Sequence, residues 1–233
     1  RDVERSRGLG DVYKRQNIER RMNLKQLSLT LKIRLICDFF QNMIVTAFLP
    51  FMALYLTDMV NQHFAGLFLF ALVMINFPIS IISGHIIERL PKKTLTLSYQ
   101  SILSLMLVIM AITISEQAYM IILFCIAYAI FSIIIGMQQP IMDTIIMDAI
   151  TPEVEQYIYK VSYWLTNIAV AFGALIGGLM YGAHKSMLFL IAFAIYIMVF
   201  IALFIWLPKD LNQVNQSYTC LLYTSDAADE EDS

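Results

Sequence analysis

Charged side chains are scarce in this chain: they make up 15% of its 233 residues, whereas hydrophobic residues make up 59%. Soluble globular domains carry about a quarter charged residues, and the mean hydropathy here is +0.68. This composition excludes an ordinary soluble domain and indicates a membrane protein. We therefore expect the lipid bilayer as a partner, and no nucleic acid.

Catalytic and metal-binding motifs are also missing from the sequence. It contains no HExxH, no GxSxG and no P-loop, and its three histidines, His63, His85 and His184, lie far apart. This excludes a zinc protease, a serine hydrolase and an ATP-driven pump subunit. Cys37 and Cys125 lie inside apolar runs, where nothing suggests a disulfide or a metal site. We expect no enzyme activity, no metal and no cofactor.

Both ends of the sequence differ from the rest. Residues 6–16 and 220–230 read as in-frame translations of sequencing-library adapters, and the last eight residues hold five acids. Such segments are excluded from fold reasoning. Without residues 1–16 and 220–233 the formal charge changes from −2 to +1. The native start is then predicted upstream of the first span, with Met22 as one possibility.

Long apolar runs dominate the remainder. A bilayer core about 30 Å thick requires roughly 20 apolar residues per helix. Backbone groups in lipid must be hydrogen-bonded within their own segment, so these runs are predicted to be helices. The predicted spans are residues 33–56, 64–87, 94–114, 119–140, 161–181 and 186–207.

The segments between the spans set the predicted domain organisation. Residues 17–32 form an N-terminal segment, 33–207 the six-helix domain and 208–219 the start of a central loop. A long charged connection is predicted over residues 141–160. If the N-terminus is cytoplasmic, ten basic residues flank the spans inside and only Lys185 lies outside. The positive-inside rule then places both native ends in the cytoplasm of a multi-pass protein of the plasma membrane.

The segment from Gly84 to Lys93, between the second and third spans, has a distinctive pattern. It places one acid and three cations within six positions, in the order GHIIERLPKK. This pattern resembles the signature segment of the major facilitator superfamily, with Glu88 where Asp is usual and Pro91 where Gly is usual. The resemblance implies an all-α membrane fold, here its N-terminal six-helix half built from two inverted three-helix repeats. The matching positions are Gly84, Glu88, Arg89, Lys92 and Lys93.

The resemblance also implies a role for this segment as a conformational latch. Glu88 and Arg89 would join a charge network with acids at the cytoplasmic ends of later helices, for which Asp143 and Asp148 are the candidates. The alternative is that the basic residues of the segment only enforce membrane topology.

Polar residues in the first span form a stripe. Arg34, Asp38, Asn42 and Thr46 are four residues apart, which places them on one helical face. Charged residues within a membrane usually face a cavity or a partner. Asp38 is therefore a candidate cation or proton site on a substrate pathway. The alternative is that Asp38 only pairs with Arg34 near the membrane boundary.

Other spans supply weaker signals. Asn76 and Ser80 in the second span continue a stripe towards Gly84, which we interpret mainly as a helix-packing seam. In the fourth span Ser132 occupies the place where proton-coupled relatives often carry Arg. Tyr163 and Trp164 are interfacial anchors or ligand contacts. Pathway candidates in the fourth and fifth spans are Tyr128, Ser132, Gln138, Gln139, Thr166 and Asn167.

The fifth span contains a glycine pattern, with Gly173, Gly177 and Gly178 in the stretch AVAFGALIGG. It resembles an antiporter signature, although Ala174 replaces the usual Pro. Glycines four residues apart also form a groove that lets another helix approach closely. Antiport and ordinary packing therefore both remain open.

These observations together predict a secondary transporter that works by alternating access, driven by an ion or proton gradient. The scarcity of charge in the spans favours an exporter of apolar or cationic small molecules, similar to drug/proton antiporters. A solute importer and a non-transporting six-span protein are the alternatives. In the transporter interpretation, a C-terminal six-helix half of the same chain would complete the substrate site.

Overall fold

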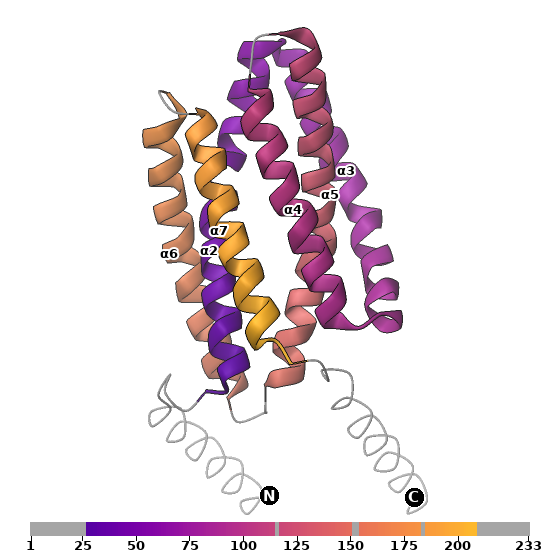
Figure 1. Cartoon of the computed structure of the whole chain (residues 1–233), viewed down its shortest axis with the longest axis vertical. Helices are drawn as coiled ribbons and strands as arrows, with labels where there is room; N and C mark the ends of the chain where they lie inside the picture. Colours follow the sequence, from indigo (N-terminus) through magenta and orange to yellow (C-terminus); the bar gives the residue numbers. More distant parts are fainter. Residues whose placement is uncertain (1–26, 115–116, 151–153, 183–184, 209–233) are drawn as a thin grey trace, which may run out of the picture.

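The computed structural model describes residues 27–114, 117–150, 154–182 and 185–208. Within these ranges the fold is entirely helical, and the six helices are each long and apolar enough to cross a membrane. They stand side by side as a bundle (Figure 1). Their bounds are α2 Leu29–Met59, α3 Gln62–Arg89, α4 Lys92–Thr113, α5 Ala118–Ala149, α6 Glu155–Tyr181 and α7 Lys185–Trp206. The predicted segments 1–16 and 220–233 lie outside the described residues.

Local sequence explains several helix ends. The Ser28 hydroxyl accepts a hydrogen bond from the Leu31 backbone N–H and begins α2, and the Asn61 side chain does the same for Phe64 at the start of α3. Ser and Asn are favoured at this position because they bond backbone donors that have no partner within the helix. Pro91, with φ −59°, precedes α4. It holds Leu90 in an extended conformation, which ends α3.

The helices pack in a definite order. Helix α2 packs chiefly against α6 and α7, α4 packs against α5 and α7, and α3 packs against α5. Aromatic residues form much of the core, where Phe48 contacts Phe131 and Phe189 with ring centroids 5.3 and 5.6 Å apart. Helices α3 and α6 are the least covered. Leu67, Phe70 and Phe77 on α3 are each more than half exposed, which is the surface expected to face lipid or another helix.

Helix α5 differs from the sequence-based prediction. Its helix runs through Pro140 to Ala149, so the predicted long connection over residues 141–160 is wrong. Proline is tolerated in membrane helices because neighbouring groups compensate for the lost backbone bond. Beyond it, the buried residues Ile141, Met142, Ile145 and Ile146 recur at helical spacing and attach this extension to the bundle.

The two ends of the bundle differ in chemistry. Helix α3 ends, α4 begins and α5 ends at the lower end in Figure 1, which we name the charged end because it carries Lys92, Lys93 and Asp148. The junction between α2 and α3 and the start of α5 lie at the opposite end.

Candidate functional site

The signature segment at the charged end is mostly helical. Gly84 to Arg89 form the last turns of α3, and only Leu90 and Pro91 separate α3 from α4. The connection between α3 and α4 is therefore a two-residue turn, and the rest of the signature segment belongs to the two helices. A Cβ added at Gly84 would meet no atom within 4 Å, so nothing in the described structure requires glycine there for space.

The two lysines of this segment tie three helices together. Lys92 at the start of α4 forms a direct ion pair with Asp148 near the end of α5, and both side chains are buried, 9% and 1% exposed. The Lys93 ammonium group donates to the backbone carbonyls of Phe204 and Leu207 at the end of α7. A cation is favoured there because the helix C-terminus carries partial negative charge.

Glu88 and Arg89 behave differently from the lysines. Both are exposed, and within the described residues neither side chain makes an ion pair or hydrogen bond. Of the two acids predicted to join the latch, Asp148 contacts the signature segment through Lys92. Asp143 instead accepts a hydrogen bond from Gln139 at 3.4 Å.

Arg34 and Asp38 form an ion pair on α2, with Nη1 of Arg34 3.1 Å from Oδ1 of Asp38. The alignment falls short of a good hydrogen bond, so the attraction is mainly electrostatic. The Arg34 side chain is buried, and its Nε donates to the Met142 backbone carbonyl at 3.4 Å. Arg34 and Asp38 also lie within electrostatic range of Asp143. The three groups form a charge cluster between α2 and α5.

A polar cavity of about 70 Å³ lies beside this cluster, between α2, α5 and α7. We name it the polar pocket. One carboxylate and four side-chain amides contribute to its walls, a concentration of polarity that is unusual in an apolar bundle. Its lining residues are Asp38, Gln41, Asn42, Val45, Ile135, Gln138, Gln139, Met142 and Tyr196.

A network of glutamines supports the polar pocket from α4. Gln100 is fully buried, and its Oε1 accepts hydrogen bonds from Gln41 at 2.8 Å and Gln138 at 2.9 Å. Its Nε2 donates to the Tyr196 backbone carbonyl at 3.1 Å. The network connects α2, α4, α5 and α7, so one buried side chain positions two walls of the pocket.

The structure brings together only some of the predicted pathway residues. Asp38 and Asn42 line the polar pocket. Ser132 accepts a hydrogen bond from Asn76 at 3.0 Å, a contact between α3 and α5. Tyr128 is buried in the core beside Phe68.

Two further pathway candidates lie elsewhere. The exposed Asn167 on α6 donates to the Tyr163 carbonyl of its own helix at 2.7 Å. Thr46 lies at the contact with α6, where its Cβ would be 3.0 Å from a Cβ added at Gly173.

The glycines of α6 form a tight seam with α2. A Cβ at Gly173 would overlap the Met43 carbonyl oxygen, and one at Gly177 would overlap that of Ala47. Gly178 has more room, with the Phe51 ring 4.0 Å from an added Cβ. The groove expected from glycines four residues apart is therefore present, and α2 occupies it.

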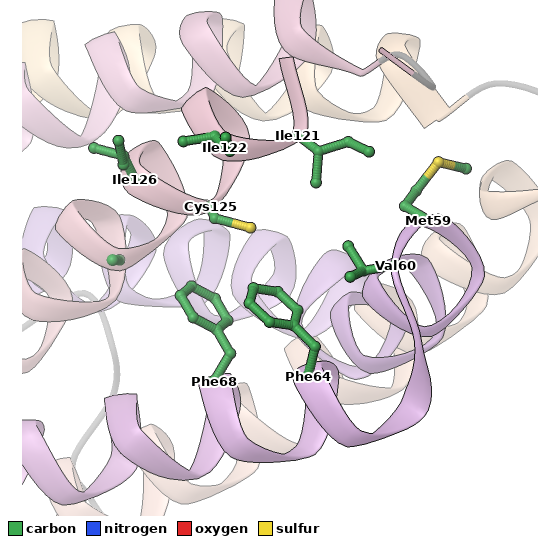
Figure 2. Close-up of a pocket in the computed structure, with 9 residues that line it drawn as sticks. Met59, Val60, Phe64, Phe68, Ile121, Ile122, Cys125 and Ile126 are labelled. Carbon is green, nitrogen blue, oxygen red and sulfur yellow. The ribbon is translucent and has the colours of Figure 1, made fainter. Parts of the chain in front are cut away.

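A second, larger cavity opens at the opposite end of the bundle. It measures about 610 Å³ and is lined by apolar residues of α2, α3 and α5. Figure 2 shows Phe64 and Phe68 of α3 directed across it towards Cys125 and Ile121 of α5. We name it the apolar pocket. Its lining residues are Met59, Val60, Phe64, Phe68, Ile121, Ile122, Cys125, Ile126 and Ala129.

Sequence analysis missed Gln41 and Gln100. Gln41 directly precedes Asn42 of the polar stripe, and Gln100 is an amide within an otherwise apolar run. A polar side chain inside an apolar run was therefore the feature of the sequence that could have identified both. What the sequence could not supply was the partner of each amide. Within the described ranges no group of three or more His, Cys, Asp or Glu residues lies together as a metal site would require.

Comparison with known proteins adds two findings. The sequence model of the Major Facilitator Superfamily matches residues 33–217. The chain is also similar to the Na(+), Li(+), K(+)/H(+) antiporter of Planococcus maritimus, with 23% identity over 169 residues. The similarity covers 72% of this chain but 40% of that antiporter, so the chain spans less than half the length of this relative.

Proposed function

The chain belongs to the major facilitator superfamily, and on that premise we propose that it forms the N-terminal half of a cation/proton antiporter. The complete transporter would contain a second six-helix half, since the similar antiporter is longer than the matched region. Alternating access would then arise from rocking of the two halves about a site near the middle of the membrane. We place the charged end in the cytoplasm of the plasma membrane, in accordance with the positive-inside rule.

The observation that carries this proposal is the charge cluster between α2 and α5. Arg34 supplies one positive charge, and the ionised forms of Asp38 and Asp143 supply two negative charges. With both acids ionised, the cluster would have one net negative charge within an apolar bundle. Charged side chains inside a membrane-spanning bundle are rare, and they commonly mark an ion pathway or a proton relay.

The exchange follows from this charge balance. A proton on Asp38 and a cation in the polar pocket would each neutralise the cluster, and simultaneous binding would leave excess positive charge. The site would thus release its proton when a cation enters, and release the cation when a proton returns. Export of cations from the cytoplasm would follow from an inward proton gradient.

Replacing Asp38 with Asn in the complete transporter tests the proposal. The substitution keeps the shape of the side chain but removes its negative charge, so proton-coupled cation exchange should be abolished. Everted membrane vesicles report exchange as recovery of a preformed pH gradient on addition of Na⁺ or K⁺.

The control is Asn167→Leu, which removes an exposed amide of α6 outside the polar pocket without adding a charge and should leave exchange unchanged. Undiminished exchange by Asp38→Asn would exclude Asp38 as the coupling residue. Exchange by neither wild type nor variants would reject antiport and return attention to a solute importer or a non-transporting protein.

We also propose that the signature segment is a latch between the halves. Lys92 and Asp148 pair within this half, whereas Glu88 and Arg89 are exposed and accessible to a second half. Arg89→Glu should then weaken transport without reducing membrane insertion. Transport at the wild-type rate by this variant would reject the latch.

A lipophilic organic cation is the second candidate substrate. The apolar pocket favours it, because about 610 Å³ of aromatic and aliphatic surface falls in the size range of sites for drug-like molecules. Efflux of a fluorescent lipophilic cation, measured alongside Na⁺ exchange, separates the two substrates.

A further inference from the structure

The hydrogen bonds around the polar pocket determine which way each amide faces. The Tyr196 backbone carbonyl can only accept, so Gln100 must present its NH₂ group to it. The Oε1 of Gln100 then faces Gln41 and Gln138, which must both present NH₂ groups. The carbonyl oxygens of Gln41 and Gln138 are therefore not used by this network.

The two remaining amides obey the same logic. The NH₂ group of Asn42 donates to the Asp38 backbone carbonyl at 2.9 Å, and that of Gln139 donates to the Asp143 carboxylate. The Asp38 backbone carbonyl has no proton to give, and neither has Asp143 in its ionised form, so each amide directs its nitrogen towards its acceptor. Four amides around one pocket thus use their nitrogen atoms as donors. No donor from the described part of the chain bonds any of their four oxygen atoms.

From this geometry we infer that the polar pocket is a binding site for a monovalent alkali-metal cation. Carbonyl and carboxylate oxygens are the ligands preferred by hard cations. Gln41, Asn42, Gln138 and Gln139 line the pocket and carry amide oxygens with no described donor, and Asp38 adds a carboxylate. Asp143 is not among the lining residues, and it would act on the pocket through its hydrogen bond with Gln139. It is a positioning residue.

Charge and size select the class of cation. The cluster of Arg34, Asp38 and Asp143 has one net negative charge when both acids are ionised, which a monovalent ion neutralises. Divalent cations generally bind several carboxylates, whereas only Asp38 lines this pocket directly. A volume of about 70 Å³ has room for a few water molecules. This size favours a small ion over an organic cation, which the larger apolar pocket could accept.

Direct binding of Na⁺ tests this inference. The transport role of the site rests on the proposed function, but binding itself can be measured without transport. Binding of radioactive Na⁺ to the purified complete protein is measured in choline chloride by scintillation proximity. Saturable binding is expected, with displacement by Li⁺ or K⁺ and none by choline. Asn42→Leu and Gln139→Leu should each weaken binding by about tenfold or more, as loss of a site group typically does.

Asn167→Leu is the matched control. Asn42 and Asn167 both donate to the backbone carbonyl four residues earlier in their own helices, but only Asn42 lines the pocket. The control should retain wild-type affinity. Gln139 is exposed, so its variant should fold even if Asn42→Leu does not, and gel filtration verifies folding for each protein.

The outcomes separate this inference from antiport itself. Na⁺ binding that is lost in the pocket variants but retained in the control supports the cation site, even if no exchange occurs. Absence of saturable binding to folded wild-type protein overturns the site, as does unchanged affinity in both pocket variants. If exchange persists in that case, antiport stands and the cation binds elsewhere.

Discussion

The two ends of the helix bundle are held together by different interactions. At the charged end, Lys92 pairs with Asp148 and the Lys93 ammonium group binds the end of α7. At the opposite end, aromatic packing dominates, for example between Tyr55 and Phe124 with ring centroids 4.7 Å apart. The cation there, Lys185, lies over the Tyr181 ring at 4.6 Å.

This difference extends to the cavities. The pocket towards the charged end is small and has a partly polar lining, whereas the pocket at the opposite end is large and apolar. Polar contacts have directional requirements, so they define discrete arrangements of the helices. Apolar contacts have weaker directional requirements and tolerate ligands of varied shape. Under the proposals made above, the first region would recognise the ion and the second any lipophilic substrate.

The largest expected effect comes from breaking the buried ion pair at the charged end. Lys92→Met leaves the Asp148 carboxylate buried without Lys92, which should lower the free energy of unfolding by about 3–5 kcal/mol. Arg89→Met removes an exposed cation of the same segment and should change the free energy of unfolding by less than about 0.5 kcal/mol. Chemical denaturation in detergent micelles measures both. Equal losses would contradict a special role for the Lys92–Asp148 pair.

An intermediate effect is expected from the glycine seam. Gly177→Ala forces α6 away from the Ala47 carbonyl, and overpacking of this kind costs about 1–3 kcal/mol. Gly84→Ala meets open space at the charged end, so helix propensity should leave its stability unchanged or raise it by up to about 1 kcal/mol. Thermal unfolding of the two variants provides the comparison. A stable Gly177→Ala protein would show that the seam is looser than the structure indicates.

The smallest effect on stability should come from filling the apolar pocket. Ala129→Leu places a larger apolar side chain in existing space and should change the free energy of unfolding by less than about 1 kcal/mol. It should reduce efflux of a lipophilic cation while leaving Na⁺ exchange intact. Loss of both activities together would mean that the two pockets do not divide the substrates as proposed.

Sequence reasoning predicted the architecture well because membrane helices are long and apolar. The six spans and the family resemblance drawn from Gly84 to Lys93 were confirmed. The prediction failed at residues 141–149, where charged residues such as Asp143 and Asp148 suggested a connection but α5 continues as a helix with buried contacts. Local signals could not weigh the packing of Ile141 and Ile145 against these charges.

The candidate site was predictable only in part. The spacing of Asp38 and Asn42 placed both residues on one face, and both line the polar pocket. Gln100 escaped notice because its importance depends on Gln41 and Gln138, which lie 59 and 38 residues away in the sequence. Thr46 shares the stripe of Asp38, but it contacts the glycine seam because α6, rather than the pocket, covers that turn of α2.

The sequence by itself determined that this chain forms membrane-spanning helices, because continuous apolar runs of about 20 residues can bond their backbone groups within the segment only as helices. It also determined the order of charges in the signature segment. Only the tertiary structure decided which polar side chains meet, and therefore which oxygen atoms remain available for a cation. The reason is physical: helical periodicity assigns a residue to a face, but hydrogen-bond partners come from other helices, whose arrangement depends on packing of the whole bundle.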